Sequence, residues 1–574
     1  MLFTLGALMP LSCRALSYAV KIEAPDPLKA VLTQHLPLLT RQTDEGMDAD
    51  ELDGLQRSSA DSARQLLETE GYFSAQVKVW RQQGSTPTIH VDVDPGAPTL
   101  IAALNLSLVG PIATQPEMAA RQQQLQHQWP MPVGAVFRQL EWDAGKKQAL
   151  RQLQADGFPL GQISASRVEI DPEHHQARVF LTLDSGAEVR FGALEIHGLS
   201  RYPRSLVDGV ADFKPGDPYR LQALLDLQSA LEQGAQFSNA LVSADLTRIR
   251  DGRAPVVVEL TEVPRKKLDL GLTYDSDVGA GTRIGYEHYN VFDRGWTGSS
   301  VWSWDRSSDT LGLGLSLPRS ADGFIDSLNA QFKSTDIQGL MTNAQQVGVW
   351  RSRAHDRDEL RFGLDYLQES QRVDGVPVQN NHALLPSVGW TDRKVDNLLH
   401  PQSGFLLDGA LSATPGGLLS STHFVRAYGR GVAYWTPWPA VWGTWLARVE
   451  LGQVWAGDLN QVPASQLFRA GGVNSVRGYD YQSLGVAANG AIVGGAVLAT
   501  SSLEYQIPLI PGWALALFTD AGDAAQNWQS FQLRRSRGIG VRWFSPVAPF
   551  SLDIAQAQQE QRRLSIHMSL GLAF

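Results

Sequence analysis

The sequence has little cysteine, few long apolar stretches and no run of basic residues. Its 574 residues include one cysteine, Cys13, which excludes a cysteine-based metal cluster. Asp and Glu outnumber Lys and Arg by 59 to 49, and no segment has the basic character that follows a phosphate backbone, so we expect no nucleic-acid partner. Beyond residue 19 no apolar stretch reaches about 18 residues, which excludes a transmembrane helix. Two classes of protein are left: a soluble protein, or a membrane barrel whose strands alternate apolar and polar residues.

The first nineteen residues, MLFTLGALMPLSCRALSYA, form an apolar stretch that ends in small residues. This pattern predicts a signal peptide over residues 1–19, cleaved before Val20. Cleavage would remove Cys13 and leave a mature chain without cysteine. Such a chain avoids unwanted disulfides in an oxidising compartment such as the periplasm. We therefore expect the protein to be exported.

Tryptophan is scarce in the first half of the chain, with three residues before residue 265, and abundant in the second, with thirteen after it. Indole rings favour the membrane–water interface. Residues 310–317, 359–366 and 564–574 alternate apolar with polar or small side chains. This alternation is typical of a transmembrane barrel, and residues 265–574 have room for about 16 antiparallel strands. A large soluble β-sandwich would also alternate, but the aromatic load weighs against it.

The first half of the chain repeats. Three segments share one order of features: residues at helical spacing, then a glycine, then a strand of alternating apolar and polar residues. These segments are EGYFSAQVKV (70–79), DGFPLGQISASRV (156–168) and GAQFSNALVS (234–243). A pair of strands follows the first two junctions at 88–108 and 177–198. Self-similarity at this period predicts a tandem array of small α+β domains.

Each repeat has the order strand–helix–helix–strand–strand, which resembles the POTRA (polypeptide-transport-associated) domain. Three such domains before a barrel resemble the outer-membrane assembly superfamily that contains BamA and TamA. The domain count is closest to the TamA family, because BamA carries five POTRA domains and two-partner secretion transporters carry two. The resemblance covers essentially the whole mature chain. It implies POTRA domains at 20–97, 98–186 and 187–264, and an outer-membrane β-barrel at 265–574.

A motif near the C-terminus carries the most specific resemblance. FRAGGVNSVRGYDYQSLG (468–485) resembles the superfamily's loop-six motif, a loop folded into the lumen, whose tip is here Arg477, Gly478 and Tyr479. FTDAGDA (518–524) resembles the strand motif that faces this tip, which implies Phe518 and Asp520 as partners. A buried arginine needs a carboxylate, and bidentate geometry suits it. An Arg477–Asp520 pair is therefore predicted; the alternative is that Arg477 faces lumen water and Asp520 merely ends a strand.

Barrel closure should pair the first strand with the last. We expect Leu268, Leu270 and Leu272 to face outward on the first strand, with Leu270 opposite the last strand. Gly571 weakens the last strand, because glycine favours kinks, and the resemblance implies that Phe574 is a C-terminal insertion signal. We predict a seam with few hydrogen bonds. The alternative is a fully zipped barrel in which Gly571 faces a crowded lumen.

Two pairs of polar residues could belong either to a catalytic or metal site or to the lumen and surface of the protein without such a role. His567 and Ser569 lie two apart on one strand face, as His-x-Ser does in outer-membrane lipid-A deacylases. An orienting acid and an oxyanion pocket are also needed for hydrolysis, and we identify neither nearby, so we expect His567 and Ser569 to be ordinary lumen residues. His174 and His175 follow a proline in a turn, where surface residues are expected in place of a metal site. We therefore expect no catalytic residue, no metal and no cofactor.

The resemblance implies a non-enzymatic protein of the outer membrane, with its POTRA domains in the periplasm. It would insert β-barrel clients such as autotransporters or help to secrete them, by POTRA capture and lateral opening of the seam. The implied partners are a TamB-like inner-membrane-anchored protein, unfolded outer-membrane protein clients and outer-membrane lipid. The alternatives are a two-partner secretion transporter, a barrel hydrolase acting on lipid and a passive porin, which would not need periplasmic domains.

Overall fold

The computed structural model describes residues 17–42, 44, 47–84, 86–320, 322–355, 357–397, 400–415, 417–437, 442–545, 549–559 and 564–573. The chain divides into two compact units. The first comprises Met1–Glu195, Phe213–Leu225 and Ser243–Val257, and the second comprises Ile196–Asp212, Asp226–Val242 and Val258–Phe574.

Three small sheets precede the barrel, each of three strands with the last strand in the centre, in the orders β1-β3-β2, β4-β6-β5 and β7-β9-β8. The first contains β1 (Ala19–Glu23), β2 (Gln76–Gln82) and β3 (Thr88–Asp94), with helices α1 (Asp26–His35), α2 (Pro37–Thr40) and α3 (Ala49–Thr69). The second contains β4 (Leu100–Val109), β5 (Gln162–Asp171) and β6 (Gln176–Asp184), with α4 (Pro111–Thr114), η1 (Pro116–Met118), α5 (Ala119–His127) and α6 (Gln139–Ala155). The third contains β7 (Arg190–His197), β8 (Phe237–Ala244) and β9 (Arg253–Glu262), with α7 (Ser205–Asp208) and α8 (Leu221–Glu232). The domain boundaries near residues 97, 186 and 264 stay predictions.

The helix α3 illustrates why these segments fold as they do. The Asp48 carboxylate caps its first turn by accepting a hydrogen bond from the Glu51 N–H at 2.8 Å. Leu52, Ala63 and Leu67 recur at helical spacing and are buried. This apolar face packs with strand residues such as Val91 in one cluster, which makes the core of the first small domain.

The end of the predicted signal peptide overlaps the first small domain. Residues 1–16, including Cys13, lie outside the described residues. Tyr18 is buried and donates its hydroxyl to the Leu38 carbonyl at 2.8 Å, and Ala19 pairs with Thr88. Cleavage before Val20 would therefore remove a core side chain. The cleavage position stays a prediction.

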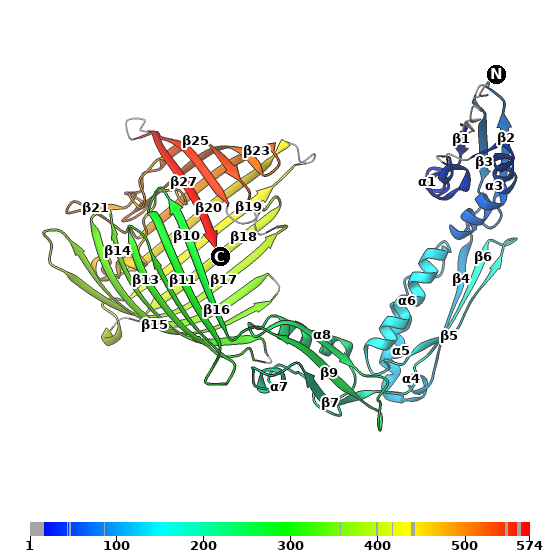
Figure 1. Cartoon of the computed structure of the whole chain (residues 1–574), viewed down its shortest axis with the longest axis horizontal. Helices are drawn as coiled ribbons and strands as arrows, with labels where there is room; N and C mark the ends of the chain where they lie inside the picture. Colours follow the sequence, from blue (N-terminus) through cyan, green and yellow to red (C-terminus); the bar gives the residue numbers. More distant parts are fainter. Residues whose placement is uncertain are drawn as a thin grey trace, which may run out of the picture. The chain divides into compact units, whose positions relative to one another are not determined.

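A closed barrel of sixteen antiparallel strands follows, which confirms the predicted fold class (Figure 1). Its strands run in chain order, and the last, β27, closes on the first, β10. The strands are β10 (Lys266–Asp275), β11 (Gly279–Val291), β12 (Trp296–Trp304), β13 (Ser308–Ser316), β14 (Phe324–Ile337), β15 (Leu340–His355), β16 (Asp358–Val373), β17 (Gln379–Val395), β18 (Gly404–Thr414), β19 (Phe424–Trp435), β20 (Thr444–Ala456), β23 (Val497–Ile510), β24 (Trp513–Ala525), β25 (Arg534–Trp543), β26 (Phe550–Ala557) and β27 (Leu564–Ala573).

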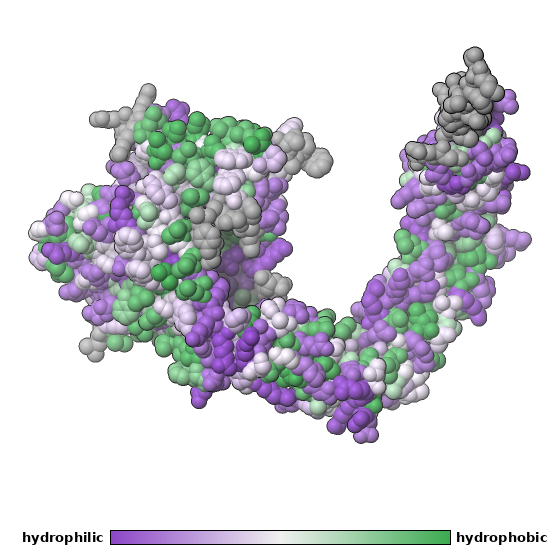
Figure 2. Space-filling view, in the orientation of Figure 1, coloured by the Kyte–Doolittle hydropathy of each residue, from purple (hydrophilic) through white to green (hydrophobic). Residues whose placement is uncertain are grey.

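The outside of the barrel is apolar. Side chains at alternate positions of its strands are exposed, among them Leu313, Phe362 and Ile539. Figure 2 shows hydrophobic residues gathered over β23, β25 and β27 at the top of the view. Trp304 and Trp435 are exposed at the ends of their strands, where an interfacial belt would place them. No helix in the described part of the chain is long and apolar enough to cross a membrane.

Within the second unit, the turn between β11 and β12 is fastened to the segments that precede the barrel. The Asn290 amide donates to the Arg201 carbonyl at 2.8 Å and accepts from the Gly295 N–H at 2.7 Å. The Gln236 amide donates to the Gly295 carbonyl at 3.0 Å. Partial burial would raise the pKa of the Glu262 carboxyl, but backbone N–H groups of Arg201 and its neighbours donate to it and lower that pKa below its usual range.

We expect Asn290→Ala to loosen this joint. Asn290 is 3% exposed, so the substitution leaves the buried Gly295 N–H without its partner, at about 1–3 kcal/mol. The Arg201 carbonyl keeps the Arg265 guanidinium as a donor. Hydrogen exchange should accelerate over residues 291–297 while the barrel keeps its heat-modifiable mobility on gels. The control is Asn343→Ala, because Asn343 is exposed on β15. Equal exchange in the two variants would contradict the prediction.

Candidate functional site

The segment between β20 and β23, residues 457–496, folds into the barrel lumen. It contains the short helices η4 (Leu459–Gln461) and η5 (Ala464–Gln466) and the two-stranded sheet of β21 (Val486–Ala488) and β22 (Ala491–Val493). Its apolar residues Phe468, Val476 and Leu484 form one buried cluster with Leu367 and Leu385 of the barrel wall. We call this segment loop six.

Polar contacts hold loop six along the wall. Glu369 of β16 is 1% exposed and accepts hydrogen bonds from the backbone N–H groups of Ala464 and Ser465. Arg426 of β19 donates to the Gln466 carbonyl at 3.0 Å. A long loop costs closure entropy, and these contacts with both strands offset part of that cost.

The tip of loop six carries Arg477, which the structure places against Asp520. The guanidinium donates from Nε to Asp520 Oδ2 at 2.8 Å and from Nη2 to Oδ1 at 2.9 Å, and the Arg477 backbone N–H donates to Oδ2 at 3.0 Å. Arg477 is 4% exposed and Asp520 is 1% exposed. The bidentate geometry matches the fork of an arginine and fixes the orientation of the tip. The alternative, in which Arg477 faces lumen water, does not fit this burial.

Phe518 lies beneath the guanidinium. The Arg477 Cζ atom is 3.4 Å from the centre of the Phe518 ring, a cation–π contact shielded from water. Gly538 lies opposite Phe518 on β25, and a Cβ atom there would collide with the ring. A Cβ at Gly540 would likewise collide with the Asp553 carboxylate. The glycines of β25 therefore leave room for the side chains that meet the tip.

Three further charged residues complete the site, and the sequence analysis missed all of them. Arg477 Nη1 donates to Glu504 at 2.7 Å and to Asp553 at 3.2 Å. Arg542 donates to the same two carboxylates, at 2.6 Å to each at its shortest contacts. With Asp520 the set holds three carboxylates and two guanidinium groups, a formal charge of about −1. We call these five residues the lumen charge cluster. Alternation predicts that they face inward, but it cannot predict which of them meet.

The other two residues of the tip contact the last strands. Gly478, with a φ of 94°, donates its N–H to His567 Nε2 at 2.8 Å. Tyr479 is fully buried, and its hydroxyl donates to the Gln559 side chain at 2.9 Å. His567 was expected to be an ordinary lumen residue, yet it binds the tip directly.

Asp277, in the turn between β10 and β11, joins the tip to the first strand. Its carboxylate accepts from the Val473 N–H of loop six at 2.7 Å. It also lies 3.4 Å from His567 Nδ1. The expectation that no acid lies near His567 is therefore wrong, because the turn brings Asp277 across the seam. His567 Nε2 already accepts the Gly478 N–H, so it holds no free lone pair for a general base.

The seam between β10 and β27 is a short ladder. Among the described residues it contains five pairs, from Gly271 opposite Ala573 to Asp275 opposite Ser569, whereas β10 and β11 share ten. Beyond these pairs the Ser276 N–H donates to the Met568 carbonyl at 2.9 Å. Leu268, Leu270 and Leu272 face outward and are at least half exposed. Leu270 lies beyond the described ladder, Gly571 pairs with Thr273, and Phe574 lies outside the described residues.

Comparisons with known proteins agree with this architecture. A family model described as the Omp85 superfamily domain matches residues 279–574. The outer membrane protein assembly factor BamA of Neisseria meningitidis serogroup B is 23% identical over 520 residues, which cover 77% of this chain but only 64% of that protein. The crystal structure of BamA from Haemophilus ducreyi lacking POTRA domains 1–3 has a TM-score of 0.65 at 17% identity, covering 83% of this chain and all of that one. CdiB from Escherichia coli gives a TM-score of 0.50 at 12% identity, over 96% of this chain and 99% of its own.

We expect Arg477→Ala to release loop six. The substitution removes the ion pairs of Arg477 with three buried carboxylates, of which Arg542 also contacts Glu504 and Asp553, and breaking a buried ion pair costs about 3–5 kcal/mol. Limited proteolysis should then cut within residues 457–496. Asp520→Asn should be milder, because it brings the formal charge of the cluster to about zero.

The control is Arg535→Ala, which removes an exposed arginine from β25. If Arg477→Ala resisted proteolysis as well as Arg535→Ala does, the lumen charge cluster would not be what holds the loop.

Proposed function

Because the chain belongs to the Omp85 superfamily, we propose that it is an outer-membrane protein assembly factor that inserts β-barrel clients or helps to secrete them. The observation that carries the proposal is the seam, where β10 and β27 share five residue pairs in the described part of the chain. A strand edge with unpaired backbone groups can template an incoming strand. A seam that opens easily would offer two such edges to a client.

The contacts around the seam suggest how it opens. The lumen charge cluster links loop six to β23, β24, β25 and β26, all of which lie on the β27 side of the seam. Across the seam, loop six reaches the β10–β11 turn through Asp277 and Val473. Lateral opening would therefore break the ladder and the Asp277 contacts, and it would leave the charge cluster intact.

The small sheets supply further strand edges for capturing an extended client. Each has two outer strands, and in the second sheet the outer strand β5 spans ten residues, most of them exposed. β-Augmentation uses backbone hydrogen bonds and tolerates many sequences, which suits a protein that handles several clients. We infer that capture precedes insertion at the seam.

We also propose that the chain is of the TamA type. In the part of the chain that the structure describes, three small α/β sheets precede the barrel, as the resemblance to the TamA family implies. The proposed clients are autotransporters and other unfolded outer-membrane proteins. The proposed partners are a TamB-like inner-membrane-anchored protein and outer-membrane lipid, with the barrel in the outer membrane and the POTRA domains in the periplasm.

A two-partner secretion transporter is the second candidate, favoured by the fold shared with CdiB over nearly the whole chain. It would export one substrate through its lumen, part of which loop six occupies here. A lipid hydrolase would need His567 as a base, but Gly478 already donates to its Nε2 atom.

The seam can be locked with a disulfide between Tyr274→Cys and Leu570→Cys, residues that lie opposite each other on β10 and β27. Directly opposite residues bring their Cβ atoms within about 5.5 Å, and a disulfide needs about 3.5–4.5 Å. In proteoliposomes, the oxidised variant should lose insertion of a model autotransporter barrel, and reduction should restore it.

The matched control locks Leu313→Cys to Ala330→Cys, which are opposite on β13 and β14 away from the seam. It should insert the client normally. If the oxidised seam variant inserted at the control's rate, lateral opening would not be the mechanism.

Depleting the protein separates the two candidate functions. An assembly factor should lower the amounts of several outer-membrane β-barrel proteins together, because they share one insertion route. A two-partner secretion transporter should lower one secreted protein and leave the outer-membrane proteome unchanged. Quantitative proteomics of outer-membrane and culture fractions gives the answer.

A further inference from the structure

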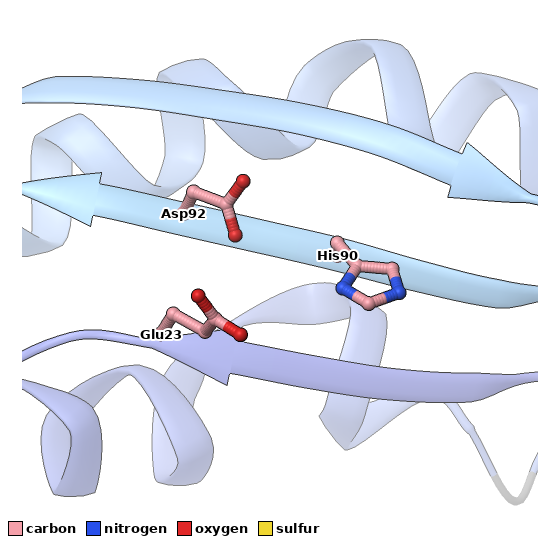
Figure 3. A group of neighbouring side chains, drawn as sticks. All are labelled: Glu23, His90 and Asp92. Carbon is pink, nitrogen blue, oxygen red and sulfur yellow. The ribbon is translucent and has the colours of Figure 1, made fainter.

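Three potential metal ligands meet on the first small sheet, far along the chain from the lumen charge cluster. Glu23 lies on β1, and His90 and Asp92 lie on the central strand β3 (Figure 3). Glu23 is directly opposite Asp92 in the parallel pairing of these strands. One ligand atom from each residue lies within 4.8 Å of the other two. Among the residues that the structure describes, no other group of three such side chains has this spacing.

The imidazole of His90 is buried and held in one orientation. It is 9% exposed and stacks on Trp80, with ring centres 3.9 Å apart. Its Nε2 atom is 3.2 Å from Gln82 Oε1, and because a carbonyl oxygen can only accept, this contact favours the tautomer with the proton on Nε2. In this tautomer Nδ1 has a free lone pair for a metal ion. Figure 3 shows that this nitrogen is on the side of the ring that faces Glu23. No hydrogen-bond partner of Nδ1 is found within the described residues.

The carboxylate of Asp92 is also held from behind. Trp80 Nε1 donates to Asp92 Oδ2 at 2.8 Å. Metal-bound histidines and carboxylates are commonly oriented by such partners, which are not ligands themselves. Gln82 and Trp80 thus fix two of the three donors before any ion arrives, which an accidental cluster of surface charges does not require.

Glu23 is the adjustable member of the group. It is exposed and pairs with Lys21 at 2.7 Å, also at the surface. An exposed ion pair of this kind is weak and screened by salt, so a divalent cation can displace the ammonium. Ligand atoms around a tetrahedral Zn²⁺ lie about 3.4 Å apart, given bonds of about 2.1 Å. The present spacing of up to 4.8 Å would have to contract toward that value, and the exposed Glu23 side chain is free of packing that would oppose such a movement.

We propose that Glu23, His90 and Asp92 bind a divalent transition-metal ion of the Zn²⁺ class, with water completing the coordination. One imidazole and two carboxylates suit Zn²⁺ better than Ca²⁺ or Mg²⁺, which take oxygen ligands. The ion would tie the five-residue outer strand β1 to the central strand. It would also neutralise the two carboxylates on the exposed face of the first small sheet. This site revises the expectation of no metal, which had considered only His174 and His175.

The test uses the full chain in detergent, treated with a chelator and dialysed. Titration calorimetry with Zn²⁺ should give one site per chain, and Co²⁺ should give visible absorption from the same site. His90→Gln and Asp92→Asn should each weaken Zn²⁺ binding at least about tenfold. Gln82→Ala keeps all three ligands and should weaken binding by about tenfold, the effect of losing a supporting contact. Lys21→Gln should bind more tightly, because the competitor for Glu23 is gone.

A histidine–carboxylate pair elsewhere provides the matched control. His174 contacts Asp171 at 2.9 Å in the second small domain, and His174→Gln should leave Zn²⁺ binding unchanged. Hydrogen exchange gives a second measurement: Zn²⁺ should slow exchange over residues 19–23 in the parent chain and not in His90→Gln. Equal affinity of the parent chain and His90→Gln, or slowing in both, would overturn the proposal. Circular dichroism checks that each variant is folded.

Discussion

The position of loop six in the lumen depends on the buried guanidinium group of Arg477. A charge that leaves water is tolerated only when it is paired and its donors are satisfied, and Arg477 meets this condition with carboxylates from three strands and the ring of Phe518. Those carboxylates are buried as well, so they need Arg477 as much as it needs them. The position of loop six follows from this mutual requirement.

The same constraint explains the composition of the last strands. An inward carboxylate on β26 needs space, which Gly540 provides, and an inward phenylalanine on β24 needs the space above Gly538. Arg542 bridges Glu504 and Asp553 and holds the formal charge of the cluster at about −1; without it the cluster would have two fewer ion pairs and a formal charge of about −2. Inward side chains of β23 to β26 therefore act as one unit, and a change at one position alters the requirements of the others.

Local patterns predicted the architecture well, because period two and the domain repeat are properties of short segments. The contact between Arg477 and Asp520 came from a resemblance, since no spacing rule joins a loop to a strand 43 residues away. Glu504 and Asp553 were missed because alternation gives a face but not the register between strands. Asp277 was missed for a stronger reason: it meets His567 only when the barrel closes. Contacts that depend on closure are invisible to any local pattern.

Closure also divides the lumen contacts into two sets of different strength. On the β27 side, loop six is held by buried, multiply bonded charges, whose separation would leave uncompensated charge in the lumen. On the β10 side it is held by the Asp277 carboxylate and, farther along the wall, by the β14–β15 turn, where the Gln338 amide donates to the Tyr481 carbonyl at 3.0 Å. A force that separates strands acts first on the weaker set. Because the lumen charge cluster lies wholly on the β27 side of the seam, a parting of the barrel at the seam would leave those charges paired.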